Sequence, residues 1–308
     1  MEDKIEPCLN SILNQDFSDY EVIVVDDGST DATAKKAGKY PVRLIRQSNR
    51  GIAGARNAGA DISQGEILIF LDGDCMVERN FITRMVEPLS QAQVGMTQGY
   101  IDIANPQSLT AQLIFMKARY VFHNLEYLDF SWGGCVAIRK DLFERLGRFG
   151  ELIKFVEDDD LAYRIIDQGY KIYLVKEAKF FHPFPESLWK HLVRNARTAR
   201  WVVRLATEWR RFQSQHFNLL EYFKLIVHTL TILALPFIFW TPIPFLALLT
   251  ISLASHSTLA YRTMRYGLRY ILIIPMEFLT KLSWVVGLAL GLVDILLRRG
   301  LGSVPVKY

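Results

Sequence analysis

The chain has few cysteines, and none of them lies in a zinc-binding spacing. Cys8, Cys75 and Cys135 are the only three among 308 residues. Their separation fits no zinc motif, and their odd number leaves at least one without a disulfide partner. This distribution predicts reduced cysteines in a domain that faces the cytosol. The sequence also lacks a signal peptide before its first helix-like segment.

The chain has only a small excess of positive charge. Its formal net charge is +4, and arginines are concentrated between Lys190 and Arg211. Strands that interleave aromatic and basic residues, a platform for single-stranded nucleic acid, are absent. We therefore expect a membrane surface or a phosphate group as the partner, and no nucleic acid.

Charged residues become rare from Tyr222 onward. Three apolar segments follow one another at 223–240, 245–261 and 270–297, and three such segments in succession argue against buried core helices. They predict a transmembrane region of two or three helices at 222–300, followed by a tail at 301–308. Gly287 and Gly291 have the spacing of a close-packing helix face.

A basic loop separates the second and third apolar segments. It contains Arg262, Arg265 and Arg269. By the positive-inside rule, this loop and the amino-terminal domain lie in the cytosol, which predicts an integral protein of the cytoplasmic membrane. The third segment then either spans the membrane against the rule, or its first part, 270–280, lies in the interface.

The most informative stretch is the apolar run 67–71, which ends in Asp72-Gly73-Asp74. A buried strand would deliver two carboxylates to one edge of a sheet, and the glycine between them leaves room for a bulky ligand. Clustered carboxylates repel each other unless a hard divalent cation lies among them. The run therefore predicts a site for Mg²⁺ or Mn²⁺.

A second acidic run precedes a helical pattern later in the chain. It consists of Glu157, Asp158, Asp159 and Asp160. A carboxylate that is separate from a metal site can act as a general base. One acidic cluster for a metal ion and one for proton abstraction together indicate group transfer from a metal-bound diphosphate.

Strand and helix patterns alternate along the first two thirds of the chain. The expected strands are 21–27, 42–45, 67–71, 94–103, 135–138 and 172–175. The expected helices are 7–15, one capped by Ser29 or Thr30 that runs through Lys39, 51–59, 108–127, 141–146 and 158–168. This alternation predicts an open α/β sheet with ligands at the carboxyl ends of its strands.

With these motifs in place, residues from about 5 to 200 resemble the inverting glycosyltransferases of family 2, which have the GT-A fold of nucleotide-diphospho-sugar transferases. The resemblance rests on five ordered signatures: Val24-Val25-Asp26-Asp27-Gly28-Ser29-Thr30-Asp31, Gly54-Ala55-Arg56-Asn57-x-Gly59, Phe70-Leu71-Asp72-Gly73-Asp74, Gly133-Gly134 before a strand, and Glu157-Asp158-x-Asp160-Leu161. It implies a GT-A domain at 1–187, with an open, mostly parallel sheet and helices on both faces. An amphipathic interfacial region at 188–221 and the transmembrane helices would follow.

The resemblance also implies roles for individual residues. Asp27 would accept a hydrogen bond from the nucleotide base, Asp72 would face the ribose, and Asp74 would bind the metal ion that bridges the diphosphate. Arg56 would contact a phosphate or the sugar, unless it is a surface arginine. Asp158 would be the general base that deprotonates the acceptor hydroxyl, whose attack inverts the anomeric carbon.

The remaining candidates line the sugar pocket or support the site. Gly133 and Gly134 would form a turn of the nucleotide-sugar pocket. His182 either supplies a third metal ligand, as in some GT-A enzymes, or is a plain loop histidine. Asp160 is expected to cap or support the helix that follows it.

A basic and aromatic element occurs close to the apolar region. Arg197, Arg200 and Trp201 resemble the Gln-x-x-Arg-Trp element of processive family 2 synthases, with arginine in place of glutamine. They would hold the diphosphate and the acceptor sugar. Alternatively, they belong to an interfacial helix whose arginines meet lipid headgroups.

One element of the family pattern is missing. Family members begin with an apolar strand before the first helix, whereas here Met1 falls at or inside that helix. The strand would be central, and without it two internal edges stay unpaired. Either the true start lies upstream or the chain is a compromised relative. A gap or a rearranged sheet is expected between the strands at 21–26 and 67–71.

Together these features predict a hexosyltransferase-type enzyme of family 2. It would be metal-dependent and inverting, and would move a sugar from a UDP- or GDP-sugar to a lipid-linked or envelope glycan acceptor at the cytosolic membrane face, as in cell-envelope polysaccharide biosynthesis. A processive polysaccharide synthase and a non-catalytic, truncated relative that binds nucleotide sugar are the alternatives. A nucleotidylyltransferase is disfavoured, because no glycine-rich loop followed by arginine and lysine is present.

Overall fold

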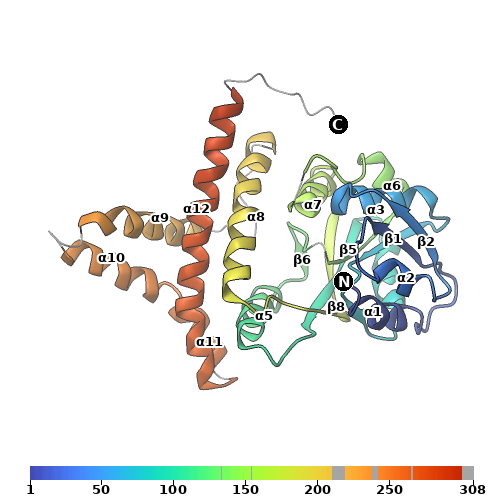
Figure 1. The fold of residues 1–308 in the computed structure, drawn as a ribbon, viewed down its shortest axis with the longest axis horizontal. Helices are drawn as coiled ribbons and strands as arrows, with labels where there is room; N and C mark the ends of the chain where they lie inside the picture. The colour runs from blue at the N-terminus through green and yellow to red at the C-terminus, as the bar shows by residue number, and fades with distance from the viewer. Residues whose placement is uncertain (133, 154, 210–218, 238–241, 265, 300–308) are drawn as a thin grey trace. The chain divides into compact units, whose positions relative to one another are not determined.

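The computed structural model describes residues 1–132, 134–153, 155–209, 219–237, 242–264 and 266–299 (Figure 1). Within these residues the chain forms two compact units. The first comprises Met1–Asn105 and Val121–Pro183, and the second comprises Pro106–Tyr120 and the described residues from Phe184 onward. Gly133, which the sequence predicts to line the sugar pocket, lies outside the described residues, as does the tail at 301–308.

The first unit begins with a small parallel sheet and its helices. These elements are α1 (Ile5–Ile12), β1 (Ile23–Asp27), α2 (Thr33–Ala37), β2 (Arg43–Gln47) and α3 (Gly51–Ile62). Ile5, Leu9 and Ala37 form a buried core against the two strands. Gly59 lets α3 approach β1 closely, because a Cβ there would lie 3.3 Å from Val25 Cγ2.

A larger mixed sheet forms the rest of the first unit. Its strand order is β3-β7-β5-β8-β4, and β6 pairs with β8. Its strands are β3 (Ile67–Leu71), β4 (Met76–Val77), β5 (Val94–Ile103), β6 (Tyr127–Leu128), β7 (Cys135–Arg139) and β8 (Lys171–His182). The longest ladder, β5 with β8, is parallel, whereas β7 runs antiparallel between β3 and β5.

Helices flank this sheet and close its core. They are α4 (Phe81–Val86), η1 (Glu87–Ser90), α6 (Lys140–Arg145) and α7 (Glu157–Asp167). Phe70 of β3 packs against Phe143 of α6 and against Phe149, with ring centroids 5.2 and 5.0 Å apart. This aromatic cluster anchors the strand whose carboxyl end carries Asp72 and Asp74.

The predicted discontinuity of the sheet is confirmed. β1 pairs only with β2, and β3 pairs only with β7, among the strands that the structure describes. Helix α1 contacts the turn after β3 instead. Cys8 Sγ donates to the carbonyl of Asp72 at 3.8 Å, and Ser11 Oγ accepts from the backbone N–H of Val77 at 3.1 Å. The first helix therefore holds the turn that carries the acidic pair.

The helix after β1 differs from the expectation. It was expected to start at Ser29 or Thr30 and to reach Lys39, but α2 covers only Thr33–Ala37. Asp31 Oδ1 accepts a hydrogen bond from the backbone N–H of Thr33 at 3.0 Å, while the N–H of Ser29 donates to Asp26 Oδ1. These local bonds favour a turn over residues 28–32 and delay the start of the helix.

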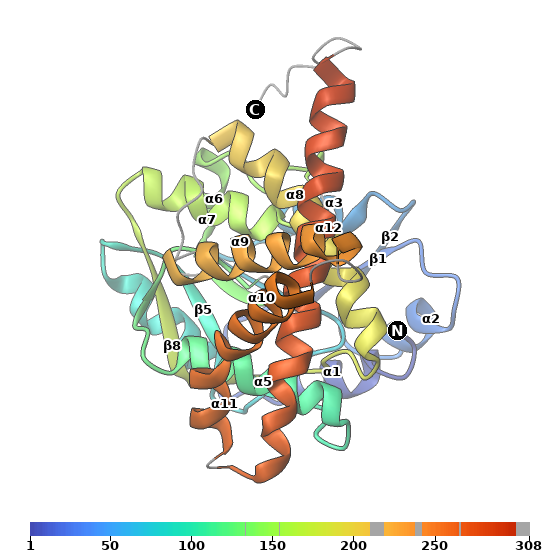
Figure 2. The same cartoon turned by 90° about the vertical axis from the view of Figure 1, so that its left-hand side faces the viewer.

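The second unit is helical. It contains most of α5 (Leu109–Phe122), then α8 (Leu188–Trp209), α9 (Leu219–Ala234), η2 (Leu235–Phe237), α10 (Pro242–Ala254), α11 (Ser257–Met264), η3 (Leu268–Leu272) and α12 (Ile273–Arg299) (Figure 2). Two stretches, Pro242–Met264 and Leu268–Leu297, are long and apolar enough to cross a membrane. The first apolar segment gives a shorter helix, Phe223–Ala234.

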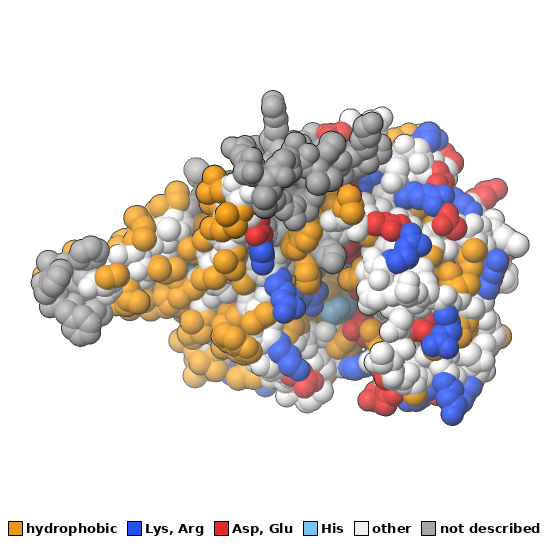
Figure 3. All heavy atoms as spheres, turned by 45° about the horizontal axis from the view of Figure 1, so that its top comes forward, with side chains coloured by type: hydrophobic (Ala, Val, Ile, Leu, Met, Phe, Trp, Pro, Cys, Tyr) orange, Lys and Arg blue, Asp and Glu red, His pale blue; other side chains and the backbone are white. Residues whose placement is uncertain are grey.

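Apolar side chains are exposed over α9, α10 and α12. Examples are Leu233, Ile243 and Leu296, and Figure 3 shows such side chains gathered on the helical unit. Two charged residues in the first half of α12 are paired instead. Glu277 accepts from Lys117 Nζ at 2.6 Å, and Lys281 pairs with Glu221. Pairing of this kind lowers the cost of charges in an apolar unit.

Two glycines of α12 lie against α8, as their spacing predicts. A Cβ on Gly287 would lie 2.2 Å from the carbonyl oxygen of Ala196, and one on Gly291 would lie 2.6 Å from that of Arg200. These obstacles are backbone atoms, so they cannot rotate away. The two helices therefore depend on bare backbone for their close contact.

We expect Gly287→Ala to lower the stability of the helical unit by about 1–3 kcal/mol, because α8 and α12 must separate to admit the methyl group. Thermal unfolding of the full chain in detergent would measure this loss. Leu290→Ala, at a position that is 46% exposed on the same helix, is the matched control and should change little. Equal melting temperatures for Gly287→Ala and wild type would contradict the contact.

Candidate active site

The acidic pair predicted from the sequence lies in a tight turn at the end of β3. The N–H of Asp72 donates to the carbonyl of Gly134 at 3.1 Å, which ties this turn to the start of β7. The N–H of Cys75 donates back to the carbonyl of Asp72 at 3.0 Å. The buried strand thus presents Asp72 and Asp74 at one edge of the sheet, as expected.

Gly134 borders both Asp72 and His182. A Cβ at this position would lie 3.7 Å from Asp72 Oδ2 and equally far from His182 Cδ2. The nearest atom would be Phe180 Cε2 at 3.3 Å, so a side chain here would be crowded. This position suits a ligand that must approach the backbone closely.

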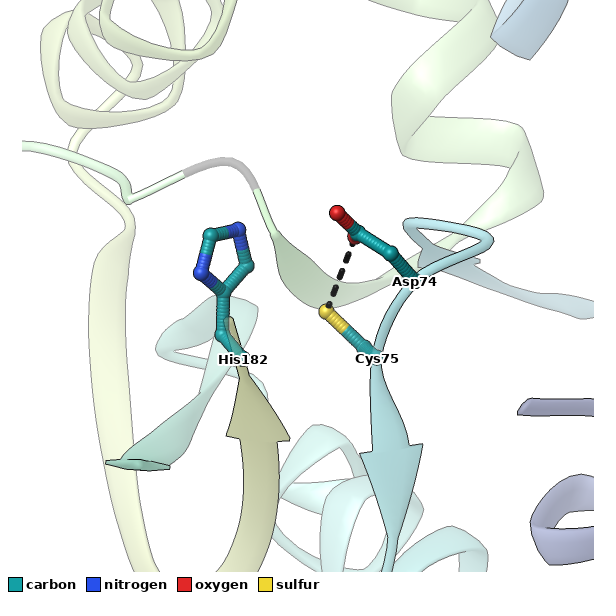
Figure 4. A group of neighbouring side chains, drawn as sticks. All are labelled: Asp74, Cys75 and His182. Atoms are coloured by element: carbon teal, nitrogen blue, oxygen red, sulfur yellow. Dashed lines mark hydrogen bonds between the residues drawn. The ribbon is translucent and has the colours of Figure 1, made fainter. Parts of the chain in front are cut away.

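The predicted metal ligands Asp74 and His182 come together with a third donor, Cys75 (Figure 4). Their ligand atoms all lie within 4.8 Å of one another. Asp74 and His182 are partly exposed, whereas Cys75 is buried beneath them. The carboxylate of Asp74 suits Mg²⁺ or Mn²⁺ when further oxygen ligands come from a substrate, and the imidazole of His182 adds a nitrogen donor.

Arg56 joins the two acidic clusters. From α3 its guanidinium donates to Asp72 Oδ1 at 2.9 Å and to Glu157 Oε1 at 3.2 Å. It also lies over the ring of Phe149, 5.2 Å from the centroid, and its side chain is only 10% exposed. Arg56 is therefore not a surface arginine. It links the end of β3 to the first turn of α7.

The first turn of α7 contains the predicted base and its acidic neighbours. Asp158 Oδ1 accepts the N–H of Asp159 at 3.0 Å, and Asp159 Oδ1 accepts the N–H of Ser131 at 3.4 Å. Asp160 is fully buried and paired with Arg164 one turn later, so its predicted supporting role in the helix is confirmed.

Burial raises the pKa values of two acids in the first turn of α7, Glu157 and Asp159. For Glu157, burial is the largest cause of the raised pKa. The negative charge of Asp158 raises this pKa further, and the positive charge of Arg56 lowers it. Burial also raises the pKa of Asp159 well above its usual range, again with Asp158 adding to the effect. Burial therefore favours the neutral form of Asp159, and the role of Asp158 as general base stays a prediction.

We expect the stability of the first unit to fall as the pH rises, through Glu157. Its folded pKa of about 7 exceeds the ordinary value of 4.5, so between these pH values the folded state holds a proton that the unfolded state has released. Glu157→Gln should therefore reduce the stability loss between pH 5 and pH 8 by roughly 1–3 kcal/mol. Unfolding at both pH values measures it, with the exposed Glu66→Gln as control. Identical pH slopes for wild type and Glu157→Gln would contradict it.

Asp27 has a local role at the start of α3. Its carboxylate accepts hydrogen bonds from the N–H groups of Arg50 and Gly51, both at 2.8 Å, and from Gln47 Nε2 at 2.7 Å. A carboxylate at a helix amino terminus also stabilises the helix dipole. Asp27 therefore helps to place α3, which carries Arg56, and base recognition by Asp27 stays a prediction.

Gln98 of β5 is a buried polar residue that the sequence did not single out. Its Nε2 donates to the carbonyls of Trp132 and Cys135 at 3.2 and 2.8 Å, and its Oε1 accepts from Ser131 Oγ and the N–H of Trp132. It thereby braces both sides of the turn that contains Gly134. A polar side chain inside the strand expected at 94–103 was the available signal.

The proposed acceptor residues lie in the second unit, on α8. Arg200 forms a two-point ion pair with Asp294 of α12, with donor–acceptor distances of 2.6 and 2.7 Å. Arg197 is exposed and Trp201 is partly buried. The structure thus gives Arg200 a packing role, and binding of substrate by these three residues stays a prediction.

Comparison with solved structures identifies the fold. The mannosyltransferase PcManGT from Pyrobaculum calidifontis, solved with GDP-Man and Mn²⁺, superposes with a TM-score of 0.60 at 21% identity. The match covers 96% of this chain and 84% of that one. The chain therefore has the GT-A fold.

Sequence comparison finds glycosyltransferases similar to the first half of the chain. Residues 2–147 match the model of glycosyl transferase family 2. The glycosyltransferase AglE of Haloferax volcanii is 31% identical over 196 residues, which are 59% of this chain and 63% of that protein. The uncharacterized glycosyltransferase EpsJ of Bacillus subtilis is 28% identical over 58% of this chain and 56% of that protein. The chain spans less than two thirds of the length of either relative, and its residues 2–147 are similar to family 2 glycosyltransferases.

Proposed function

We propose that this chain is a metal-dependent, inverting glycosyltransferase that uses a UDP- or GDP-sugar. The observation that supports this best is the meeting of Asp74, Cys75 and His182 at the end of β3, where Arg56 connects the neighbouring Asp72 to Glu157 in the acidic turn of α7. The donor diphosphate needs a group that neutralises its charge, and the acceptor hydroxyl needs a separate group that takes its proton. This arrangement offers both.

The residues divide the work between donor and acceptor. Asp72 would accept a hydrogen bond from the donor ribose, and the bare backbone of Gly134 would leave room for the sugar nucleotide. Arg56 holds the Asp72 carboxylate in place through its ion pair. Asp158 would take the proton from the acceptor hydroxyl as that oxygen attacks the anomeric carbon from the face opposite the leaving diphosphate.

Asp74 and His182 would hold the divalent cation. When bound, such a cation neutralises the charge that develops on the leaving nucleoside diphosphate. Their donor atoms are close enough for a shared ion, and the similar structure PcManGT was solved with Mn²⁺. These two facts support metal dependence and leave Mg²⁺ and Mn²⁺ as equal candidates.

The acceptor would be lipid-linked or an envelope glycan, used at the cytosolic face of the cytoplasmic membrane. Two helical stretches are long and apolar enough to cross a membrane, which supports an integral membrane protein. Arg197 and Trp201 on α8 are suited to the headgroup region of a bilayer or to an acceptor phosphate. This assignment extends the domain organisation expected from the sequence.

Hydrolysis and transfer assays with a panel of UDP- and GDP-sugars test the proposal. The full chain in detergent would be assayed with Mg²⁺, with Mn²⁺ and with EDTA, and lipid-linked acceptors would be added in parallel. We expect turnover of one donor class that EDTA abolishes and that Asp74→Ala reduces by at least about 100-fold. Glu66→Ala, at an exposed position on the same unit, is the control. Turnover that survives EDTA would refute metal dependence. Binding of a nucleotide sugar without turnover, whichever acceptor is added, would refute the proposed enzymatic activity.

A further inference from the structure

Cys75 is a third donor at the cation site that Asp74 and His182 form. Its thiol lies 3.9 Å from Asp74 Oδ1, and all three donor atoms lie within 4.8 Å of one another (Figure 4). The Cys75 side chain is completely buried. No other group of three such donors occurs among the residues that the structure describes.

The chain places Cys75 there by strand register and by a turn. β4 and β8 run antiparallel with Met76 opposite Phe181, so the residue before Met76 faces the residue after Phe181. Those residues are Cys75 and His182. In a regular strand Asp74 and Cys75 would point to opposite faces, but the turn closed by the Cys75 N–H to the Asp72 carbonyl brings both toward His182.

The spacing suits a tetrahedral ion. With metal–sulfur and metal–oxygen distances of about 2.3 and 2.0–2.2 Å, a tetrahedral site separates sulfur from oxygen by roughly 3.5 Å. The observed 3.9 Å needs only a small closing movement. Three protein donors would leave one position open, and the two partly exposed ligands provide the entry path.

The donor set differs from one built for Mg²⁺ alone. Mg²⁺ takes oxygen ligands in octahedral geometry, whereas a thiol, an imidazole and a carboxylate together favour Zn²⁺ and its thiophilic neighbours. We propose that Cys75 makes this site selective for a thiophilic divalent cation, so that Zn²⁺ binds it more tightly than Mg²⁺ and displaces the cation used in sugar transfer. Binding releases the thiol proton to solvent. Only one part of this inference, that Zn²⁺ displaces the cation used in sugar transfer, rests on the proposed function.

Cobalt provides a readout that does not depend on activity. Co²⁺ occupies zinc sites and shows a sulfur-to-cobalt charge-transfer band in the near ultraviolet when a thiolate is bound. We expect this band when Co²⁺ is added to the full chain in detergent. Cys75→Ser should abolish it, and Cys8→Ser, which removes another buried thiol of the same unit, should retain it. Cys135→Ser serves as a second control.

Affinities complete the test. Loss of an outer-shell partner already weakens metal binding 10–100-fold, so Cys75→Ser should weaken Zn²⁺ binding by at least about tenfold in competition with a chromophoric chelator, while Mg²⁺ binding changes less than about threefold. No thiolate band in the wild-type chain, or a band that persists in Cys75→Ser, would overturn the inference regardless of how the variants fold.

The two proposals fail in different ways. Sugar transfer with Mg²⁺ or Mn²⁺ but no thiolate band would leave the proposed function intact and refute the role of Cys75. If the band is present in wild type and lost in Cys75→Ser, but wild type transfers sugar from no donor, the cation site is supported and the proposed enzymatic activity is refuted. Zn²⁺ that inhibits wild-type transfer at least about tenfold more strongly than it inhibits Cys75→Ser supports both.

Discussion

Asp158→Asn is expected to lower kcat for sugar transfer by about 10²–10⁴-fold, because the amide cannot take the proton of the acceptor hydroxyl. Donor binding should be nearly unchanged, since Asp158 lies in α7 and the donor groups lie at the end of β3. The fold should also survive, because asparagine Oδ1 can still accept the N–H of Asp159. Single-turnover transfer and nucleotide binding, measured separately, would check this.

Asp159→Asn is the matched control for this prediction. It changes an acid in the same turn, and its amide oxygen can still accept the N–H of Ser131. Because burial raises the pKa of Asp159 and so favours its neutral form, the substitution by a neutral amide should cost little activity. A loss larger in Asp159→Asn than in Asp158→Asn would reverse the assignment of the base.

Arg56→Met is expected to destabilise the first unit by about 3–5 kcal/mol at pH 8, because it leaves buried carboxylates without their cation. The Glu157 side chain is 7% exposed and that of Asp72 is 35% exposed, so most of the effect comes from Glu157. The loss should shrink toward pH 5, where Glu157 becomes neutral. Denaturant unfolding at the two pH values gives both quantities.

Two further variants test the origin of this loss. Arg145→Met removes an arginine from the exposed pair with Asp141 and should cost less than about 1 kcal/mol. The double variant Arg56→Met with Glu157→Gln should recover part of the stability, because no buried charge is then unpaired. If the double variant is no more stable than Arg56→Met alone, the ion pair with Glu157 is not the cause.

Local patterns accounted for most of the secondary structure. The strand Ile67–Leu71 and the strand Val94–Ile103 were expected with the bounds found, because apolar runs between turn signals determine strands locally. The strand expected at 172–175 is longer, Lys171–His182, because its second half pairs with β5 and β4. Pairing with distant strands extends a strand beyond what its own residues indicate.

The site was predictable where one segment contains the whole signal. Asp72 and Asp74 follow a buried strand, so their place at a sheet edge depends only on neighbouring residues. Arg56 and Glu157, by contrast, are 101 residues apart in the chain, and nothing local indicates their contact. Gln98 was missed for the same reason, since its partners lie at the turn before β7.

The sequence by itself determined the two acidic clusters, the order of strands and helices in the first unit, and the apolar helices near the end of the chain. These features depend on residue type and spacing within single segments. Only the tertiary structure decided that Cys75 stands opposite His182 and that Arg56 bridges the two clusters. Register and pairing between distant strands set those contacts, and hydrophobic periodicity within one segment carries no information about them.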